Sequence, residues 1–227
     1  MHRQKRIGPN FFYGEKYSHF LKRSIDIVLS LLILIIFFPI SFLAAVAIKL
    51  DSEGPIFADV PERVGERGSH FKMYKFRSMI ANAHHILRND EKFRRLYEQY
   101  KEGSYKLRKD PRITRVGKFI RRHSIDEIPQ LINVLRGEMS LVGPRAYYPD
   151  ELDAQQKKYP DTRHLVKKVL SVKPGITGLW QVSGRSDVNF DKRIAIDASY
   201  VDNMSLWQDA KIISKTPWAM ITGKGAI

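Results

Sequence analysis

The chain contains no cysteine among its 227 residues. This absence excludes disulfide bonds, a thiolate metal site and a cysteine nucleophile. Acidic residues are also few, because 24 Asp and Glu stand against 39 Lys and Arg and leave a net charge of +15. A basic protein of this kind usually binds an anionic partner, such as nucleic acid, anionic lipid or a phosphorylated substrate. The motifs that accompany the charge decide between these partners.

Charged residues are missing altogether from residues 27–48, IVLSLLILIIFFPISFLAAVAI. A straight helix of this length reaches about 33 Å, and the hydrocarbon core of a bilayer is roughly 30 Å thick. The run starts late in the chain and is too long for the apolar part of a cleaved signal peptide. We therefore predict a basic N-terminal segment over 1–21, a membrane helix over 22–50 and a domain of soluble character over 51–227.

Pro39 lies near the middle of this run, and proline removes a backbone hydrogen bond and kinks a helix. Each arm beside Pro39 is shorter than the ~20 residues needed to cross a bilayer. Lys and Arg flank the run at both ends, and the positive-inside rule keeps both flanks in the cytoplasm. The sequence therefore favours a re-entrant helix, kinked at Pro39, that enters and leaves one leaflet. A kinked helix that crosses the membrane is the alternative.

Behind this helix the pattern predicts an α-rich α+β domain. Turn signals between short apolar runs indicate strands or a hairpin near residues 55–58 and 71–79. Residues 172–185 combine three glycines with a proline, which predicts a loop or a strand–turn–strand element. Apolar spacing predicts helices over 80–101, 128–136, 149–159, 161–169, 189–202 and 206–221.

Two adjacent carboxylates, Asp126 and Glu127, stand in the stretch HSIDEIPQ. One interpretation is structural, because Ser124-x-x-Glu127 matches a capping box at a helix start. Pro129 would then occupy the fifth helical position, where it costs an intrahelical hydrogen bond. The regular helix is therefore expected near Ile128, with both carboxylates in an irregular segment just before it.

Cations surround the acidic pair in the sequence, among them Arg121, Arg122 and Arg136. In such a field we expect the carboxylates to stay ionised, and an ionised Asp can bind a divalent metal or attack phosphorus. Arg145 follows a Gly-Pro turn and is placed to clamp a phosphate. Lys75 and Arg77 alternate along MYKFRSM, which puts both side chains on one face of the predicted strand. The adjacent His84 and His85 are expected at the surface.

These motifs, in this order, resemble the bacterial sugar transferase family, the monotopic phosphoglycosyl transferases of polyprenyl-phosphate pathways. The resemblance covers Lys22–Ile227. It rests on KRSIDIVLSLLILIIFFPI, GPIF, FKMYKFRSM, DPRITRVGKFIRRHSIDEIPQLINVLRGEMSLVGPR, VKPGITGLWQVSGR and SLWQDAKII.

The resemblance implies transfer of a sugar-1-phosphate from a UDP-sugar to undecaprenyl phosphate, with Mg²⁺, at the cytoplasmic face of the bacterial inner membrane. This reaction begins O-antigen, capsule or exopolysaccharide assembly. By the same resemblance Asp126 is the nucleophile that forms a phosphosugar intermediate and releases UMP, and Glu127 is the Mg²⁺ ligand. The expected phosphate or nucleotide contacts are Lys75, Arg77, Arg122 and Arg145.

The chain departs from the family pattern at two positions. Ala146 stands where members commonly have the second proline of Pro-Arg-Pro, and Phe38 precedes Pro39 where some members have serine. Because 21 residues precede Lys22, we expect a minimal form of the family. The sugar stays open between glucose, galactose and N-acetylated sugars.

Two other classes of function compete with the enzyme. A nucleic-acid-binding membrane protein is supported by net charge alone, since the sequence carries no recognised nucleic-acid motif, and we expect no nucleic-acid partner. A basic membrane-anchored scaffold would bind anionic membrane lipid without catalysis. Only the enzyme requires Asp126 for function.

Overall fold

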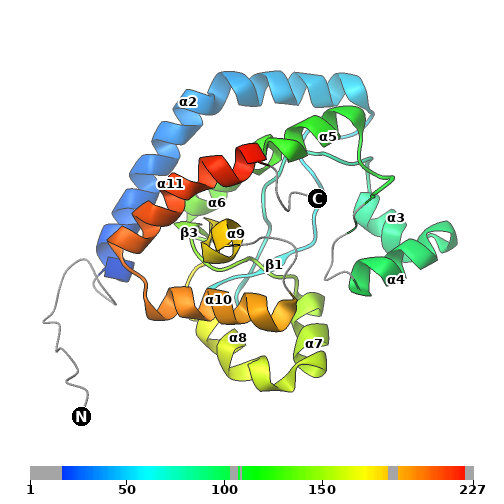
Figure 1. Cartoon of the computed structure of the whole chain (residues 1–227). Helices are drawn as coiled ribbons and strands as arrows, with labels where there is room; N and C mark the ends of the chain where they lie inside the picture. Colours follow the sequence, from blue (N-terminus) through cyan, green and yellow to red (C-terminus); the bar gives the residue numbers. More distant parts are fainter. Residues whose placement is uncertain (1–16, 103–106, 108, 184–188, 223–227) are drawn as a thin grey trace, which may run out of the picture.

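The computed structural model describes residues 17–102, 107, 109–183 and 189–222. Its longest element is the helix α2, Lys22–Asp51, which follows a short π-helix η1, Tyr17–Leu21. Figure 1 shows α2 along one side of the molecule, with the remaining helices beneath it. These are α3 (Ala83–Asn89), α4 (Arg94–Glu102), α5 (Arg115–Arg122), α6 (Gln130–Arg136), α7 (Pro149–Lys158), α8 (Arg163–Val169), α9 (Leu179–Ser183), α10 (Phe190–Asp202) and α11 (Leu206–Thr222).

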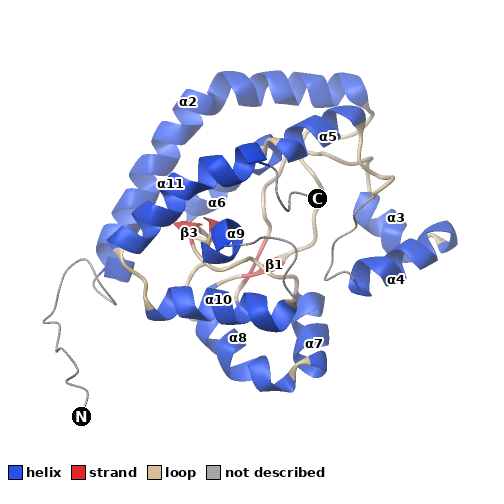
Figure 2. Ribbon diagram, viewed as in Figure 1, coloured by secondary structure: helices blue, strands red, loops and turns tan. Residues whose placement is uncertain are grey.

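Strands are few and short in the described part of the chain (Figure 2). β1 (Arg63–Val64) pairs antiparallel with β2 (His70–Phe71), and β3 (Ser140–Val142) pairs parallel with β4 (Gly175–Thr177). The remaining short elements are 3₁₀ turns, namely η2 (Glu66–Gly68), η3 (Glu91–Phe93), η4 (Ile125–Glu127) and η5 (Pro160–Thr162). The predicted α-rich α+β class is therefore confirmed.

The strand expected over 71–79 is mostly absent. β2 ends at Phe71, and beyond it Phe76 forms an isolated antiparallel bridge with Phe57, their rings stacked at 5.7 Å between centroids. Lys75 and Arg77 therefore do not share the face of a regular strand. The helix expected over 80–101 is present but broken, because Asp90 lies outside α3 and caps the next turn by accepting from the Lys92 N–H at 2.9 Å.

Helix α5 was not expected from the apolar pattern. It begins after Thr114, whose hydroxyl accepts a hydrogen bond from the Gly117 N–H at 3.0 Å. Gly117 packs directly on the chain at Ser78, because a Cβ there would lie 1.9 Å from the Ser78 carbonyl oxygen. Glycine therefore allows α5 to approach the segment that carries Lys75.

The N-terminal half of α2 is bound to the body of the protein by a buried polar stripe. Lys22, Asp26 and Ser30 lie one helical turn apart and are all buried. The Asp26 carboxylate accepts a hydrogen bond from the Leu141 N–H at 3.0 Å, which joins α2 to β3. Lys22 forms an ion pair with Asp209 of α11.

Asp209 is the acceptor at the centre of this contact. It also accepts hydrogen bonds from the hydroxyls of Tyr17 and Tyr200, each at 2.7 Å. Buried charges need partners of this kind, because a desolvated ion without one is strongly unfavourable. Four elements, η1, α2, α10 and α11, therefore meet at one carboxylate.

The C-terminal end of α2 is bound to the same body. The Arg77 guanidinium donates to the Ser52 hydroxyl at 2.6 Å and to the Ser52 carbonyl at 2.8 Å, and the Asp51 carboxylate accepts from the Val116 N–H at 3.0 Å. Between its two ends α2 bends (Figure 1), and Pro39 lies inside it. The middle of the helix is uncovered, with Ile35 70% and Phe38 67% exposed.

By length and composition α2 is able to cross a membrane. Only 11% of its most apolar window is buried in the protein, which separates it from the core helix of a soluble protein. The central core lies below α2, where residues of α6, β3 and α10 pack together, among them Leu131, Val134, Val142 and Tyr200.

Replacing Asp209 with alanine tests how the N-terminal end of α2 is held. The change leaves the buried Lys22 ammonium unpaired and removes the acceptor of two tyrosine hydroxyls. We expect the free energy of unfolding to fall by roughly 3–5 kcal/mol, because breaking a buried ion pair leaves an uncompensated charge. Denaturant unfolding of the detergent-purified protein measures this loss.

The matched control is Asp202→Ala, which breaks the exposed ion pair between Asp202 and Lys168 at 2.8 Å. We expect that loss to stay below about 1 kcal/mol, as for most surface ion pairs. Equal losses in the two variants would contradict the role of Asp209 in holding α2.

Candidate active site

A cavity of about 300 Å³ opens beside the acidic pair. Its walls come from segments far apart in the sequence, within residues 55–63, 73–84, 121–130, 145–148 and 175–181, together with Tyr100, Leu107, Asp110, Arg112 and Met139. Among the described residues, cations outnumber acids on these walls by six to four: the cations are Arg63, Lys75, Arg77, Arg112, Arg121 and Arg145, and the acids are Asp59, Asp110, Asp126 and Glu127. Such a lining suits an anionic ligand.

The turn η4, Ile125–Glu127, positions the two carboxylates. Ser124 precedes it with φ at 54°, in the left-handed region, and its side chain makes no capping hydrogen bond. The capping-box interpretation is therefore wrong. The expectation of an irregular segment before the helix is confirmed, since α6 begins only after Pro129. The Phe76 N–H donates to the Asp126 carbonyl at 3.0 Å and fixes the turn against the Lys75 segment.

Lys75 lies between the two carboxylates. Its Nζ is 3.2 Å from Asp126 Oδ2 and 3.2 Å from Glu127 Oε1. The Asp126 side chain is 6% exposed and that of Glu127 is 31% exposed. The neighbouring acids therefore have different environments, one enclosed and one open to the cavity, and this difference suits two different roles.

The protonation of this centre reflects a competition between burial and pairing. Burial raises the pKa of the Asp126 carboxyl, and the negative charge of Glu127 raises it further. The Lys75 ammonium acts in the opposite direction and lowers this pKa, but the net shift is upward. Burial also acts to lower the pKa of Lys75, but the two carboxylates outweigh it, so the pKa of Lys75 is raised. The expectation that surrounding cations alone keep both acids ionised overlooked the burial of Asp126. Lys75, with a smaller contribution from Arg121, favours the charged form of Asp126.

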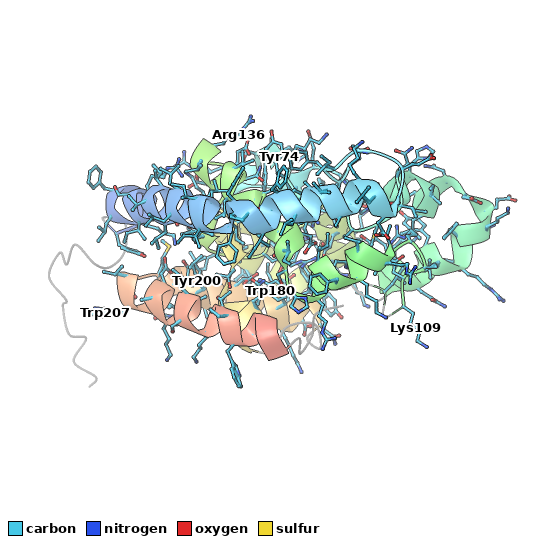
Figure 3. All side chains as sticks on the ribbon, turned by 90° about the horizontal axis from the view of Figure 1, so that it is seen from above. Tyr74, Lys109, Arg136, Trp180, Tyr200 and Trp207 are labelled. Atoms are coloured by element: carbon cyan, nitrogen blue, oxygen red, sulfur yellow. The ribbon has the colours of Figure 1, made fainter. Side chains whose placement is uncertain are left out.

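Arg145 also lines the cavity, as expected. Its guanidinium carbon lies 5.4 Å from the centre of the Trp180 ring, and its Nε is buried without a hydrogen-bond partner among the described residues. Figure 3 shows Trp180 in the interior of the molecule and Trp207 at its edge. The backbone N–H of Arg145 donates to the buried carboxylate of Asp197 at 3.2 Å, which holds the turn after β3 against α10.

Two of the expected phosphate contacts differ from Arg145 in their surroundings. Arg77 lines the cavity, but its guanidinium donates to the end of α2, so its hydrogen bonds serve structure. Arg122 is exposed on α5 and does not line the cavity, whereas its neighbour Arg121 does. The sequence offered no signal to choose between these two arginines, because the choice depends on the phase of the unexpected helix α5.

Several cavity residues were missed by sequence reasoning. His84 was expected at the surface, but it is half-buried, lines the cavity and packs edge-on against Tyr148 with ring centroids 6.3 Å apart. Burial and the nearby Arg112 and Arg63 lower the pKa of His84 to about 4, so its imidazole is neutral near pH 7. The Arg63 guanidinium lies 3.3 Å from the centre of the Tyr148 ring and donates to the Ala146 carbonyl at 3.0 Å.

The acidic pair fits one mode of binding a divalent metal. Among the described residues, no three His, Asp or Glu side chains are grouped as metal ligands, so a cage built from protein alone is not formed there. Mg²⁺ in phosphate sites commonly takes one or two carboxylates and completes its shell with substrate phosphates and water. Asp126 and Glu127 supply that number of carboxylates beside a cationic cavity.

These features define a class of protein. A helix-rich domain, joined to an apolar helix of membrane-crossing length and carrying an Asp–Glu pair in a cationic cavity, is suited to phosphorylated ligands at a membrane. The chain belongs to the bacterial sugar transferase family, whose model matches residues 17–223. The family resemblance inferred from the motifs is thereby confirmed.

Curated relatives agree with this assignment. The chain is 45% identical over 217 residues to the undecaprenyl-phosphate galactose phosphotransferase of Salmonella typhimurium, covering 94% of this chain and 43% of that protein. It is 43% identical over 213 residues to the UDP-galactose-lipid carrier transferase of Erwinia amylovora, covering 92% and 42%. It is 40% identical over 206 residues to the exopolysaccharide production protein ExoY of Sinorhizobium fredii, covering 90% and 87%. The chain thus spans less than half the length of the first two relatives and most of the third.

The Asp197 carboxylate, which accepts a hydrogen bond from the Arg145 backbone N–H, makes the folding stability of the protein dependent on pH. Burial raises the pKa of Asp197 to about 7, whereas its ordinary value is 3.8. The unfolded chain therefore binds fewer protons than the folded chain between these values, and folding stability falls as the pH rises from about 4 to about 7. The free energy of unfolding that Asp197 removes in this range is at most about 1.4 kcal/mol per pH unit. Asparagine does not titrate, so we expect Asp197→Asn to abolish this dependence on pH.

Thermal unfolding of both proteins across this pH range measures the effect. At each pH we subtract the unfolding temperature of the unchanged protein from that of Asp197→Asn, and we expect this difference to increase as the pH rises from about 4 to about 7. Asp153→Asn, at an exposed position of α7, is the control and should show a constant difference. A constant difference for Asp197→Asn as well would contradict the raised pKa.

Proposed function

We propose that the protein transfers a sugar-1-phosphate from a UDP-sugar to undecaprenyl phosphate, as the first membrane step in the assembly of a surface glycan. The observation that carries this proposal is the Asp126–Lys75–Glu127 centre in a cationic cavity beside an apolar helix. Two of the relatives are named for galactose, one as a phosphotransferase and one as a lipid carrier transferase. UDP-galactose is therefore the donor that we expect.

The reaction proceeds by two displacements at one phosphorus atom. A carboxylate oxygen of Asp126 attacks the phosphorus that carries the sugar, the bond from this phosphorus to the bridging oxygen breaks, and UMP leaves with that oxygen and the bond electrons. A phosphate oxygen of undecaprenyl phosphate then attacks the same phosphorus. The bond between phosphorus and Asp126 breaks, which regenerates the carboxylate and yields the lipid diphosphate sugar.

The environment of Asp126 suits this nucleophile. Its 6% exposure limits the access of water, which protects an aspartyl phosphate from hydrolysis. Lys75 orients the carboxylate from 3.2 Å and supports its charged form. The same ammonium lies close enough to stabilise negative charge on the phosphoryl oxygens as they rearrange.

The remaining charged residues divide between the metal and the phosphates. Glu127, the more exposed acid, is the ligand that we expect for Mg²⁺ together with oxygens of the donor diphosphate. A bound Mg²⁺ would neutralise part of the negative charge on the diphosphate. Arg121 and Arg145 line the same cavity and bind the phosphate oxygens of the donor.

The attachment of α2 supports a one-sided membrane topology. Both ends of the helix are bound to the same body, through Asp209 at one end and Arg77 at the other. A helix that crossed the membrane would have its ends on opposite sides. A bent helix that dips into one leaflet keeps both ends, and the catalytic body, on the side that the basic flanks select, which is the cytoplasmic face. The cavity then lies near the headgroups, where the acceptor phosphate lies.

Trapping of the intermediate tests the covalent step. The purified protein is incubated with UDP-galactose labelled in the sugar, without a lipid acceptor, and denatured before counting. We expect label on the unchanged protein and at least about a 1,000-fold lower rate of UMP release for Asp126→Asn, the range seen when a covalent nucleophile is removed.

Asp153→Asn, on the exposed face of α7, is the control and should keep its label, while thermal unfolding checks that Asp126→Asn is folded. Label that persists in folded Asp126→Asn would exclude Asp126 as the nucleophile. A panel of UDP-sugars in the same UMP-release assay identifies the donor, and no release with any of them would overturn the proposed function.

Because the chain has no native cysteine, single cysteines report its topology directly. We expect Arg3→Cys and Glu53→Cys, one on each side of α2, to resist a membrane-impermeant maleimide in intact cells and to react after lysis. Labelling of one position alone in intact cells would establish a membrane-crossing helix. Labelling of both would place the body on the outer face.

A further inference from the structure

A second cavity, of about 490 Å³, lies between the C-terminal half of α2 and α5. We refer to it as the α2–α5 groove. Apolar side chains form its walls, with Leu43 and Ala47 from α2 and Val116 and Phe119 from α5. Ile125 also lines it, and the next residue along η4 is Asp126. Neighbouring residues of η4 therefore line the two cavities, Ile125 the groove and Asp126 the polar cavity.

Contacts between α2 and α5 fix the walls of the groove. The Asp51 carboxylate accepts from the Val116 N–H at 3.0 Å and fixes the start of α5 to the end of α2. Beneath the groove, Ala44 and Ile120 belong to a buried apolar cluster that joins the two helices. Alanines at positions 44 and 47 of α2 leave the space that larger side chains would fill.

The lining selects the chemistry of the occupant. An apolar wall offers few hydrogen bonds to a nucleotide or a sugar, so it suits a hydrocarbon. Leu43 is 65% exposed and Phe119 is 60% exposed, so the groove opens at the face where α2 is uncovered and would meet lipid. An apolar surface of this kind marks a site of binding rather than ordinary protein surface.

The charges around the groove match a lipid with an anionic end. Arg115 lines the groove at the start of α5. Arg121, at the other end of α5, lines the polar cavity together with Asp126. A hydrocarbon chain in the groove, with its charged end at the Arg121 end of α5, would therefore place that end next to a cation and next to Asp126.

We infer that the α2–α5 groove binds the isoprenoid units nearest the phosphate of the polyprenyl phosphate acceptor and directs that phosphate to Asp126. This inference rests on the proposed function and adds to it a separate binding site for the acceptor. The donor occupies the polar cavity, while the lipid reaches the same carboxylate from the side of α2.

Ala47→Phe fills the groove and separates the two half-reactions. We expect the release of UMP in the absence of acceptor to stay within about twofold of the unchanged protein. We expect the apparent KM for undecaprenyl phosphate, measured by the loss of label from the trapped intermediate, to rise at least tenfold. The control is Val46→Phe, which enlarges the adjacent side chain of α2 outside the groove lining and should leave both half-reactions unchanged.

The two proposals fail in different ways. If the unchanged protein neither releases UMP nor traps label, the proposed function fails. If the intermediate forms and Ala47→Phe passes it to undecaprenyl phosphate as well as the unchanged protein does, the inference about the groove is overturned.

A measurement on the unchanged protein decides the matter if Ala47→Phe impairs both half-reactions. A short isoprenoid phosphate carrying a benzophenone at its first isoprene units should crosslink to peptides of α2 and α5 that contain Leu43 and Phe119. Undecaprenyl phosphate should prevent this crosslinking, whereas vesicles of phosphatidylglycerol should not. Equal competition by phosphatidylglycerol, or crosslinking elsewhere, would assign the groove to bulk lipid and overturn the inference.

Discussion

The two ends of α2 are bound to the same body of the protein, by the Lys22–Asp209 ion pair at one end and by the Arg77 guanidinium at the other. Between these ends the helix bends, with Pro39 inside it, and its middle is without protein cover (Figure 1). The helix therefore brings a large apolar surface beside the polar cavity without burying either. A site that joins a water-soluble donor to a lipid acceptor needs both surfaces within reach of one reactive group.

The net charge of +15 serves two purposes that composition does not separate. Arg112 is bound to Asp110 through two nitrogens, at 2.8 and 2.6 Å, and Arg77 binds the end of α2, so these guanidiniums hold the chain together. All four of these cations line the cavity, but the Arg145 Nε has no hydrogen-bond partner among the described residues, and Lys75 pairs with the acidic pair itself. The distinction matters because a buried cation with a full set of partners has little capacity left for a phosphate, whereas one with fewer partners can bind a ligand.

Apolar periodicity predicted most helices of the fold, and Pro129 predicted that the acidic pair lies before the regular helix. The assignment of individual arginines was less successful for a physical reason. Arg121 and Arg122 are equivalent in the sequence, and only the rotation of α5 against the body places Arg121 in the cavity. His84 was misplaced for the same reason, because its partner Tyr148 lies far away along the chain. The local sequence around a residue does not predict its contacts with distant segments of the chain.

In the proposed reaction, the turn η4 lets one carboxylate serve two unlike substrates in succession. Asp126 lines the polar cavity of about 300 Å³, and Ile125 beside it lines the apolar groove of about 490 Å³. Adjacent residues in a helical turn point in different directions, so a single turn of chain can face a diphosphate on one side and a hydrocarbon on the other. A direct transfer would require both substrates at the phosphorus together, with two anionic groups in one enclosed space. The covalent intermediate that we propose on Asp126 would avoid this repulsion, because UMP could leave before the lipid phosphate arrives.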